Sequence, residues 1–445
     1  MIVYRKRRQQ QQQKKILYPQ NRFSIASTCS VAFILCLALT STTAYTVAAP
    51  KLGRTATSSR LLSSPTLRHS SNSVTSTKGG RSSSSGDRWS IGSGMREIRG
   101  IRELADAYDV YVLDLWGVLH DGTRAYDGVH DAVRQLRARG KTLVLLSNSS
   151  KRVGHVQKLL IRLGFDPHDF AAIVTSGDAA YQLLCGADGE GFAKTLAWPS
   201  LLDATNVDQR KVFVLGSGDE DVEYCESCGW AVTALEEANL IVARGTFTIH
   251  NGGGGVDGTG EVVHKRDDTQ RYEKRLAEVL EQAAARRLPM LVTNPDKVRP
   301  DAERPPMPGA IGDAYERILA LTAAVPTVKD ETVEHQRLVK RVGKPFPDVY
   351  DLALREFTTT KGIAKDRICM IGDALETDVT GGVRYGIDTV WVLKDGIHAP
   401  ELEEYDTLEQ GASAVLVAFN DKSNTGTYAQ GLKLQPTCFV AHFRW

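Results

Sequence analysis

The stretch Val110-Tyr-Val-Leu-Asp-Leu-Trp-Gly-Val-Leu-His-Asp-Gly122 decides the fold of this 445-residue chain. A short apolar run ends at Asp114, and two glycines, Gly117 and Gly122, favour a sharp turn after it. An apolar strand that ends in a carboxylate at a glycine-rich turn is typical of a parallel α/β sheet, which presents polar groups at its carboxyl edge. Asp114 is therefore expected to be a nucleophile or a metal ligand, although a lone aspartate at such a place can also simply cap a turn.

Three segments further along the chain carry polar groups that would complete such a site. The apolar run from Thr142 ends in the hydroxyl of Ser147, and Lys344 stands in a Gly-Lys-Pro turn. The run Ile368-Cys-Met-Ile-Gly-Asp373 ends in a carboxylate, and Asp378 follows in the next helical turn. A nucleophile, a hydroxyl, a lysine and an acidic pair are suited to phosphoryl transfer, because the transferred group spreads negative charge over its oxygens.

In their order and spacing, these four segments resemble the motifs of the haloacid dehalogenase-like superfamily. Leu291-Val-Thr-Asn-Pro-Asp296 and Pro308-Gly-Ala-Ile-Gly312 resemble the cap of its class IIA branch, which is inserted between the second and third motifs. The resemblance covers residues 108–394, nearly two thirds of the chain. It implies an α/β fold in which a Rossmann-like parallel-sheet core carries an inserted α/β cap domain.

The resemblance and the alternation of apolar runs predict how the chain is divided. The expected parts are a leader over residues 1–95, a core over 99–150 and 343–420, a cap over 151–342, and a C-terminal tail over 421–445. Within the cap we expect its own parallel sheet, with a helix at 153–163 and the first strand at Ala172–Thr175. The glycine-rich segment His250–Gln270 is expected to be a flexible surface loop, and the tail shows no clear periodicity.

The resemblance also implies a role for each polar residue of the core. Asp114 would attack phosphorus and carry the phosphoryl group, Ser147 would bond a phosphate oxygen, and Lys344 would hold nucleophile and phosphate together. Asp373 and Asp378, with Asp114 and the backbone carbonyl of Trp116, would bind Mg²⁺, which prefers oxygen ligands.

The expected substrate is a small phosphorylated metabolite. Asn148 and the cap residues Asn294 and Asp296 are expected to line its binding site, although Asn-Pro also favours a plain turn. The resemblance further suggests a homo-oligomer formed through the cap.

Trp116 departs from the family pattern, which has an aspartate two residues after the nucleophile to protonate the leaving group and then activate water. An indole can do neither, and general acid–base catalysis typically contributes about 10²–10⁴-fold to rate. Three accounts stay open: His120 or Asp121 takes over proton transfer, the substrate has a good leaving group, or hydrolysis has been lost and phosphate-ligand binding kept. Trp116 itself would be either a stacking platform for substrate or a core-filling side chain.

The formal net charge of +2 hides a division along the chain. Residues 1–95 carry 14 Lys/Arg and one Asp, which leaves 41 Lys/Arg and 52 Asp/Glu in residues 96–445. The basic excess therefore belongs to the leader, and the mildly acidic remainder argues against a nucleic-acid-binding surface.

The leader is typical of a targeting sequence. Basic residues and glutamines precede a short apolar run at Val31–Leu39, and residues 51–88 are rich in Ser, Thr and Arg with a single acid. A signal-like segment followed by a transit-like one predicts import into an organelle, a plastid rather than a mitochondrion. The alternative is a disordered tail with an uncleaved membrane anchor.

Cysteine usage agrees with a reducing compartment. Cys225 and Cys228 form a C-x-x-C pair without a second ligand pair nearby, which argues against zinc and leaves packing or a redox pair.

Two functions are consistent with these residues. The first is a Mg²⁺-dependent phosphatase that works through an aspartyl-phosphate, which the complete set of nucleophile, hydroxyl, lysine and carboxylates favours. The second is a catalytically weak regulatory protein that binds a phosphorylated ligand, which Trp116 favours.

Overall fold

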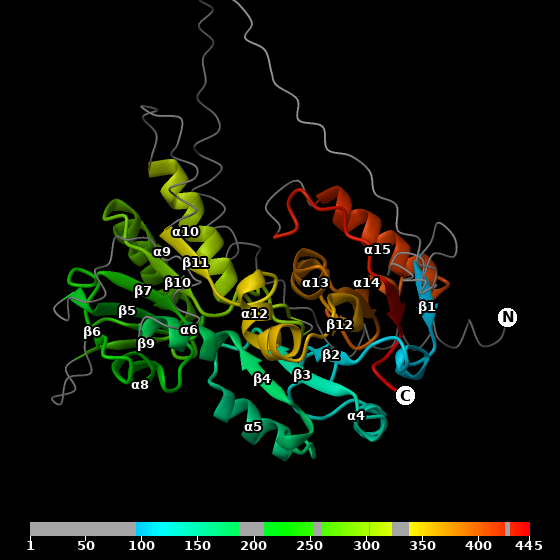
Figure 1. The fold of residues 1–445 in the computed structure, drawn as a ribbon. Helices are drawn as coiled ribbons and strands as arrows, with labels where there is room; N and C mark the ends of the chain where they lie inside the picture. Colours follow the sequence, from blue (N-terminus) through cyan, green and yellow to red (C-terminus); the bar gives the residue numbers. More distant parts are fainter. Residues whose placement is uncertain (1–94, 187–208, 253–259, 302, 323–337, 423–427) are drawn as a thin grey trace, which may run out of the picture. The chain divides into compact units, whose positions relative to one another are not determined.

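The computed structural model describes residues 95–186, 209–252, 260–301, 303–322, 338–422 and 428–445. Two sheets organise these residues (Figure 1). None of the helices described is both long and apolar enough to cross a bilayer. The predicted leader lies outside the described residues except for Met95.

Seven parallel strands form the core sheet, in the order β1-β14-β13-β12-β2-β3-β4. They are β1 Arg96–Ile98, β2 Val110–Leu113, β3 Thr142–Ser147, β4 Ala172–Thr175, β12 Ile368–Gly372, β13 Asp388–Val392 and β14 Cys438–Val440. Because β2 lies between β3 and β12, the order of the strands reverses there, and a crevice opens beyond their carboxyl ends. The predicted Rossmann-like α/β core is confirmed.

Both faces of the core sheet are buried. Along β2, Val110 and Val112 belong to one apolar cluster, whereas Tyr111 and Leu113 belong to the cluster on the other face. Burial on both faces explains why the strands are continuous apolar runs without polar alternation. The helices of this part are α4 Val129–Ala138, α5 Val153–Arg162, α6 Ser176–Leu184, α12 Pro347–Arg355, α13 Thr380–Tyr385, α14 Ala399–Leu402 and α15 Leu408–Lys422. Its shorter helical turns are η1 Ile101–Leu104, η2 Pro167–Asp169, η4 Glu356–Thr360, η5 Lys365–Arg367 and η6 Leu375–Val379.

The second sheet is built from the inserted part of the chain, in the order β11-β10-β7-β5-β8-β9 with β6 beside β5. Its strands are β5 Lys211–Gly216, β6 Ala231–Val232, β7 Leu240–Ala243, β8 Thr248–His250, β9 Val262–His264, β10 Met290–Val292 and β11 Val339–Arg341. Its helices are α8 Asp221–Glu226, α9 Thr269–Ala285 and α10 Pro308–Thr322. A parallel sheet was predicted here, but the sheet is mixed. Strand β8 runs antiparallel to β5, and β9 runs antiparallel to β8.

Two segments predicted within the cap differ from the expectation. Strand β4 pairs with β3 at the edge of the core sheet, so residues 172–175 extend the core. Residues 250–270 include β9, which forms a hairpin with β8, and thus they are not one long loop. The stretch 253–259 of that segment lies outside the described residues.

The C-terminal tail predicted for residues 421–445 contains a core strand. Strand β14 lies between β1 and β13 and pairs in parallel with both, so the last residues of the chain complete the core sheet. A strand of three residues is too short to show a periodicity in sequence, which is why the pattern gave no sign of it.

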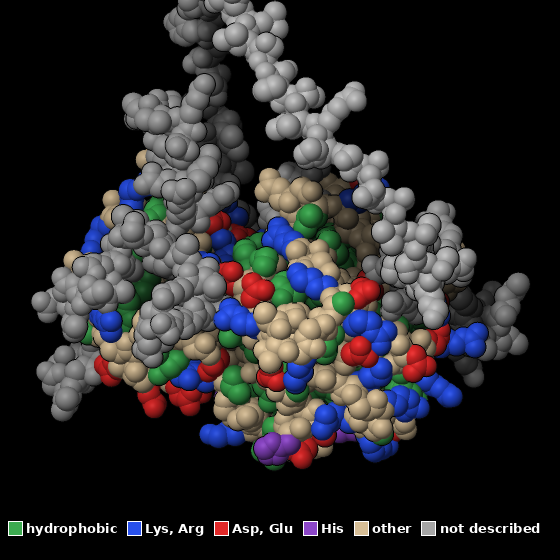
Figure 2. All heavy atoms as spheres, viewed as in Figure 1, with side chains coloured by type: hydrophobic (Ala, Val, Ile, Leu, Met, Phe, Trp, Pro, Cys, Tyr) green, Lys and Arg blue, Asp and Glu red, His purple; other side chains and the backbone are tan. Residues whose placement is uncertain are grey.

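Figure 2 shows that Lys/Arg and Asp/Glu side chains are interspersed on the face turned to the viewer. The charges on this face are therefore mixed in sign, as expected for a folded part whose acidic and basic residues are nearly balanced.

Candidate active site

Asp114 is the first residue after β2, at the point where the strand order reverses. Its backbone N–H still bonds the carbonyl of Ile371 in β12 (3.0 Å), which fixes the position of the side chain. Lys344 Nζ donates to Asp114 Oδ1 at 2.5 Å. Burial raises the pKa of Asp114 to about 7, because the effect of desolvation and of nearby Asp378 exceeds the opposing attraction of Lys344.

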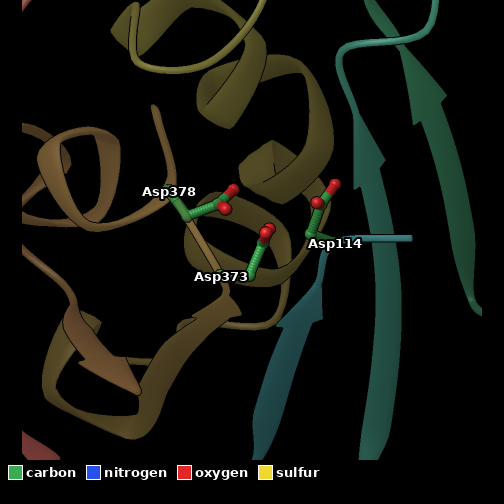
Figure 3. Close-up of side chains that lie close together, drawn as sticks. All are labelled: Asp114, Asp373 and Asp378. Carbon is green, nitrogen blue, oxygen red and sulfur yellow. The ribbon is translucent and has the colours of Figure 1, made fainter. Parts of the chain in front are cut away.

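Two further carboxylates, Asp373 and Asp378, follow β12, and with Asp114 they offer oxygens that all lie within 4.8 Å of one another. Figure 3 shows the three side chains side by side, with Asp114 at the end of its strand. Asp373 accepts the backbone N–H of Ile397 (2.7 Å), and Asp378 accepts that of Ala374 (3.0 Å). Asp378 is thus held from its own segment, and Asp373 from the loop that follows β13.

The tight approach of these loops requires glycine at position 117. Gly117 has φ +78°, and a Cβ there would lie 2.4 Å from the carboxyl carbon of Asp373. Both the left-handed backbone and the contact exclude a larger residue. The turn after Asp114 can therefore pass directly beside Asp373.

Lys344 reaches this cluster from the segment after β11, and its side chain is completely buried. Its ammonium group also pairs with Asp378 Oδ1 at 2.7 Å. Two carboxylates so close raise the pKa of Lys344 and keep it charged, despite the opposing effect of burial.

Asn148, which is predicted to contact the substrate, also forms hydrogen bonds with three other residues of the protein. Its Oδ1 accepts the backbone N–H of Lys344 (2.7 Å), and its Nδ2 donates to the carbonyl of Lys344 (3.0 Å). The same amide donates to Asp296 Oδ1 (2.8 Å) and accepts the hydroxyl of Ser176 (3.1 Å). Because an amide has two donor hydrogens and two acceptor sites, the group is fully used within the protein. Two of these four bonds go to the backbone of Lys344, so Asn148 positions that residue. Its predicted contact with substrate stays a prediction.

The cap loop that begins at Asn294 brings Asn294 and Asp296 next to the site residues of the core. Asn294 Oδ1 accepts the backbone N–H of Asp296 (2.8 Å), which closes a local turn. Burial raises the pKa of Asp296 to about 6, and its bond from Asn148 opposes the rise. Ser147, at the end of β3, accepts the backbone N–H of Ser149 (3.2 Å).

A cavity of about 430 Å³ joins these residues. Eight of the nine predicted site residues line it, namely Asp114, Trp116, Ser147, Asn148, Asn294, Asp296, Lys344 and Asp373. Asp378 is not among its lining residues, but it lies beside the cavity in an ion pair with Lys344.

The acidic cluster fits a divalent cation. Three carboxylates face one ammonium group, so with all three ionised the cluster has two negative charges that its own lysine does not balance. The pKa of Asp373 is raised by burial and by its two acidic neighbours, as expected for carboxylates that lack a counter-charge. Hard oxygen ligands of this kind suit Mg²⁺ better than zinc.

Trp116 forms part of the cavity wall and is only partly buried, so it is not the core-filling residue that was one of its two predicted roles. Its ring lies against Gly122, where a Cβ would be 2.6 Å from the indole. The ring also stands edge-on to that of His120, with the two ring centroids 6.0 Å apart.

The two residues proposed to replace the missing acid are engaged elsewhere. His120 is buried, its Nδ1 accepts the N–H of Gly122 (2.9 Å), and burial lowers its pKa to about 4. Asp121 bonds the backbone and side chain of Thr123, which together with Arg124 lowers its pKa. Neither lines the cavity, so the contacts favour a structural role for both.

The structure adds residues that sequence reasoning missed. Arg244 lines the cavity, is fully buried, and pairs with Asp221 at 2.7 Å over the ring of Tyr224. A charged residue directly after the apolar strand β7 was a signal for it. Phe247 and His398 also line the cavity, and no local pattern distinguished them.

Two sequence families match this chain. Residues 111–231 match the family described as haloacid dehalogenase-like hydrolase, and residues 341–421 match one described as HAD-hydrolase-like. Human glycerol-3-phosphate phosphatase is 30% identical over 301 residues, which cover 65% of this chain and 80% of that protein. Phosphoglycolate phosphatase 1A, chloroplastic, of Arabidopsis thaliana is 24% identical over 67% of this chain and 72% of its own length.

Solved structures agree on the fold. A haloacid dehalogenase-like hydrolase from Brucella suis superposes with a TM-score of 0.50 at 22% identity, covering 78% of this chain and 99% of that one. A possible sugar phosphatase of the same superfamily from Cytophaga hutchinsonii gives a TM-score of 0.51 at 18% identity, covering 78% and 98%.

The fold and the site thus define a hydrolase of the haloacid dehalogenase-like family, and this chain belongs to it. The α/β cap inserted into the core, together with the relatives, assigns the chain to class IIA of that family.

Proposed function

We propose that this protein is a Mg²⁺-dependent phosphoric monoester hydrolase that acts on a small phosphorylated metabolite through an aspartyl-phosphate on Asp114. One observation carries the proposal. The Asp114 carboxylate is bonded to a buried lysine and lies within 4.8 Å of two further carboxylates, at the carboxyl edge of the sheet. The names of the relatives support it, since several of them are phosphatases of small phosphorylated metabolites.

In the first step, a carboxylate oxygen of Asp114 forms a bond to phosphorus while the ester oxygen leaves with its electron pair. Lys344 holds the attacking carboxylate by its 2.5 Å bond, and Ser147 offers a hydroxyl to a phosphate oxygen in the same cavity. Water then attacks phosphorus, the bond from phosphorus to the Asp114 oxygen breaks, and a proton of the water passes to the departed ester oxygen or to solvent, so that the carboxylate is restored and inorganic phosphate is released. Each step thus uses a residue whose position is fixed by its neighbours.

Asp114, Asp373, Asp378 and the carbonyl of Trp116 would hold the Mg²⁺, which supplies positive charge to the phosphoryl group when bound. The two uncompensated negative charges of the cluster are the reason that these residues suit it.

The presence of Trp116 limits the range of phosphate monoesters that the enzyme would hydrolyse. Without a carboxylic acid at this position, the departing oxygen must leave with little help from a proton, so the enzyme would favour monoesters of relatively acidic hydroxyl groups. The wall of the cavity supports an apolar leaving group, since Trp116, Phe247, Val298 and Met307 contribute to it. Its cationic side chains are already paired with carboxylates, as in Lys151–Asp219, Arg244–Asp221, Lys297–Glu376, Arg299–Asp301, Arg304–Glu401 and Lys344–Asp114.

Trp116 also favours the second function, a regulatory protein that binds a phosphorylated ligand and turns it over weakly or not at all. The two functions differ in the fate of the bound ligand. A hydrolase releases phosphate from it, whereas a binding protein only becomes more stable with ligand.

Phosphate release by the chain from Met95 onward is expected to depend on Mg²⁺, because the acidic cluster needs a counter-charge. The measurement is inorganic phosphate released from a panel of aryl and metabolite phosphates, with Mg²⁺ and then with EDTA. Activity should fall to background in EDTA and return when Mg²⁺ is restored. Release that persists without metal would contradict the metal part of the proposal. No release at all, with ligands still raising the melting temperature in Mg²⁺, would favour the binding protein.

For the cellular location we propose an organelle, with the plastid first. The predicted two-part leader supports this, and one relative named above is chloroplastic. A fluorescent protein fused after residues 1–95 is expected to enter the organelle in a cell that has plastids. A fusion that stays in the cytosol would contradict the proposal.

A further inference from the structure

The last segment of the chain, residues 428–445, is anchored firmly in the core. Ala429, Leu434 and Phe439 are fully buried in the apolar cluster that contains Trp391. Strand β14 then joins the core sheet. The family match ends at residue 421, so this segment lies beyond it. Its first described residue is Tyr428.

Tyr428 contacts three loops of the active site at once. Its hydroxyl donates to the carbonyl of Pro295 in the cap loop (2.7 Å), and its backbone N–H donates to Glu376 Oε1 (3.2 Å). Its ring stands against that of Phe346, with centroids 5.5 Å apart and planes at 61°. One residue thus links the cap to two separate segments of the core.

The ring of Tyr428 also lies next to a cation of the cap loop. Lys297 Nζ lies 4.4 Å from the ring centroid and pairs with the Glu376 carboxylate at 2.8 Å. An ammonium group over a tyrosine face is attracted by the ring and, here, also by the carboxylate beside it. Desolvation raises the pKa of Tyr428, so the phenol keeps its proton and remains a donor to Pro295.

Each loop that Tyr428 touches carries a site residue close by. Pro295 lies between Asn294 and Asp296, both on the cavity wall. Phe346 is two residues after Lys344, and Glu376 is two residues before Asp378. Tyr428 therefore lies beside the cap loop, beside the segment that carries Lys344 and beside the segment that carries Asp373 and Asp378.

We propose that Tyr428 is a positioning residue, by which the C-terminal segment holds the cap loop 294–297 in register with the catalytic groups of the core. The phenol hydroxyl fixes the backbone of the loop at Pro295, and the ring with Glu376 fixes its side chain at Lys297. The loop in turn presents Asp296 to Asn148, the residue that aligns Lys344. The C-terminal segment is thus part of the active-site architecture.

The test is Tyr428→Phe, which removes only the hydroxyl. The buried carbonyl of Pro295 then loses its donor. The loss of one such hydrogen bond typically changes an equilibrium constant about tenfold. We expect KM to rise about tenfold while kcat stays within about twofold, because only the bond to the cap loop is lost, whereas the contacts of Tyr428 with Phe346 and Glu376 beside the catalytic groups remain. Amide hydrogen exchange should become faster in peptides that cover residues 294–301 and stay unchanged in those that cover 110–122.

Tyr315→Phe is the matched control. The Tyr315 hydroxyl is buried and donates to the carbonyl of Leu288 (2.6 Å), with that of Ala283 also in reach (3.1 Å), within the cap and away from the cavity. The Tyr315→Phe protein should lose about as much stability as the Tyr428→Phe protein, without a change in KM or in the amide exchange of residues 294–301. Lys297→Gln tests the other contact to the loop, and combined with Tyr428→Phe it should give less than the product of the two single effects.

Wild-type KM and wild-type exchange in Tyr428→Phe would overturn the proposal, and so would changes that Tyr315→Phe reproduces. The kinetic readouts rest on the proposed hydrolase function, but the exchange experiment does not. If the wild-type protein releases no phosphate, faster exchange confined to residues 294–301 still supports the positioning role, and unchanged exchange refutes it.

Discussion

Asp114→Asn is expected to abolish phosphate release, lowering the rate by at least about 10⁴-fold, as is typical when a catalytic nucleophile is removed. The amide has nearly the same shape as the carboxylate but is a poor nucleophile and carries no charge for Lys344 to pair with. The measurement combines phosphate release with mass spectrometry of acid-quenched protein. Wild type should show an added phosphoryl group on the peptide that contains Asp114, and the variant should show none.

Asp121→Asn serves as the control for this experiment. It changes another aspartate seven residues away, on the same loop, whose bonds go to Thr123 and Arg124 and not to the cavity. We expect its activity to stay within about threefold of wild type, the scatter typical of a surface change. A phosphoryl label that persists at position 114 in Asp114→Asn would contradict the assignment of the nucleophile.

Trp116→Asp is expected to raise the turnover of alkyl phosphates about 10²-fold more than that of aryl phosphates, the lower end of a general acid's usual contribution. Alkoxides are poor leaving groups and gain most from a proton, whereas a phenolate leaves readily without one. The measurement is kcat/KM over a series of alkyl and aryl phosphates, with leaving groups of increasing pKa. The dependence on leaving-group pKa should be steep in wild type and shallower in the variant.

Trp116→Phe keeps an aromatic wall without an acid and should give no such gain. The indole rests against Gly122 in wild type, and Asp opens more space there than Phe does. The effect of the carboxyl group is therefore taken from the alkyl-to-aryl ratio of kcat/KM within each variant, and not from the absolute rates. Equal or reduced rates for both substrate classes in Trp116→Asp would show that another acid already works in the site. Asp296, which lines the cavity and whose pKa is raised to about 6, would then be the first residue to replace.

Much of the site could be predicted because its parts are local. Asp114, Ser147 and Asp373 each stand at or directly after the end of an apolar strand, and parallel strands bring their carboxyl ends to one edge of a sheet. The resemblance to a known family then supplied the lysine and the cap residues.

The contacts that could not be predicted have an equally definite cause. The four bonds of the Asn148 amide could not be predicted, since two of them go to Lys344, which lies 196 residues further along the chain. The contact of Tyr428 with Pro295 spans 133 residues, and no periodicity relates them. Such bonds arise only when two distant segments are packed together.

By itself, the sequence determined the α/β class, the strand ends that carry the carboxylates, and the replacement of an expected acid by Trp116. These are properties of short segments, since side-chain periodicity and turn chemistry act over a few residues. Only the tertiary structure decided that β4 and β14 belong to the core sheet, that His120 and Asp121 are engaged outside the cavity, and that the C-terminal segment reaches the cap loop. The physical reason is that strand pairing and side-chain bonding between distant segments depend on their packing, which local patterns do not specify.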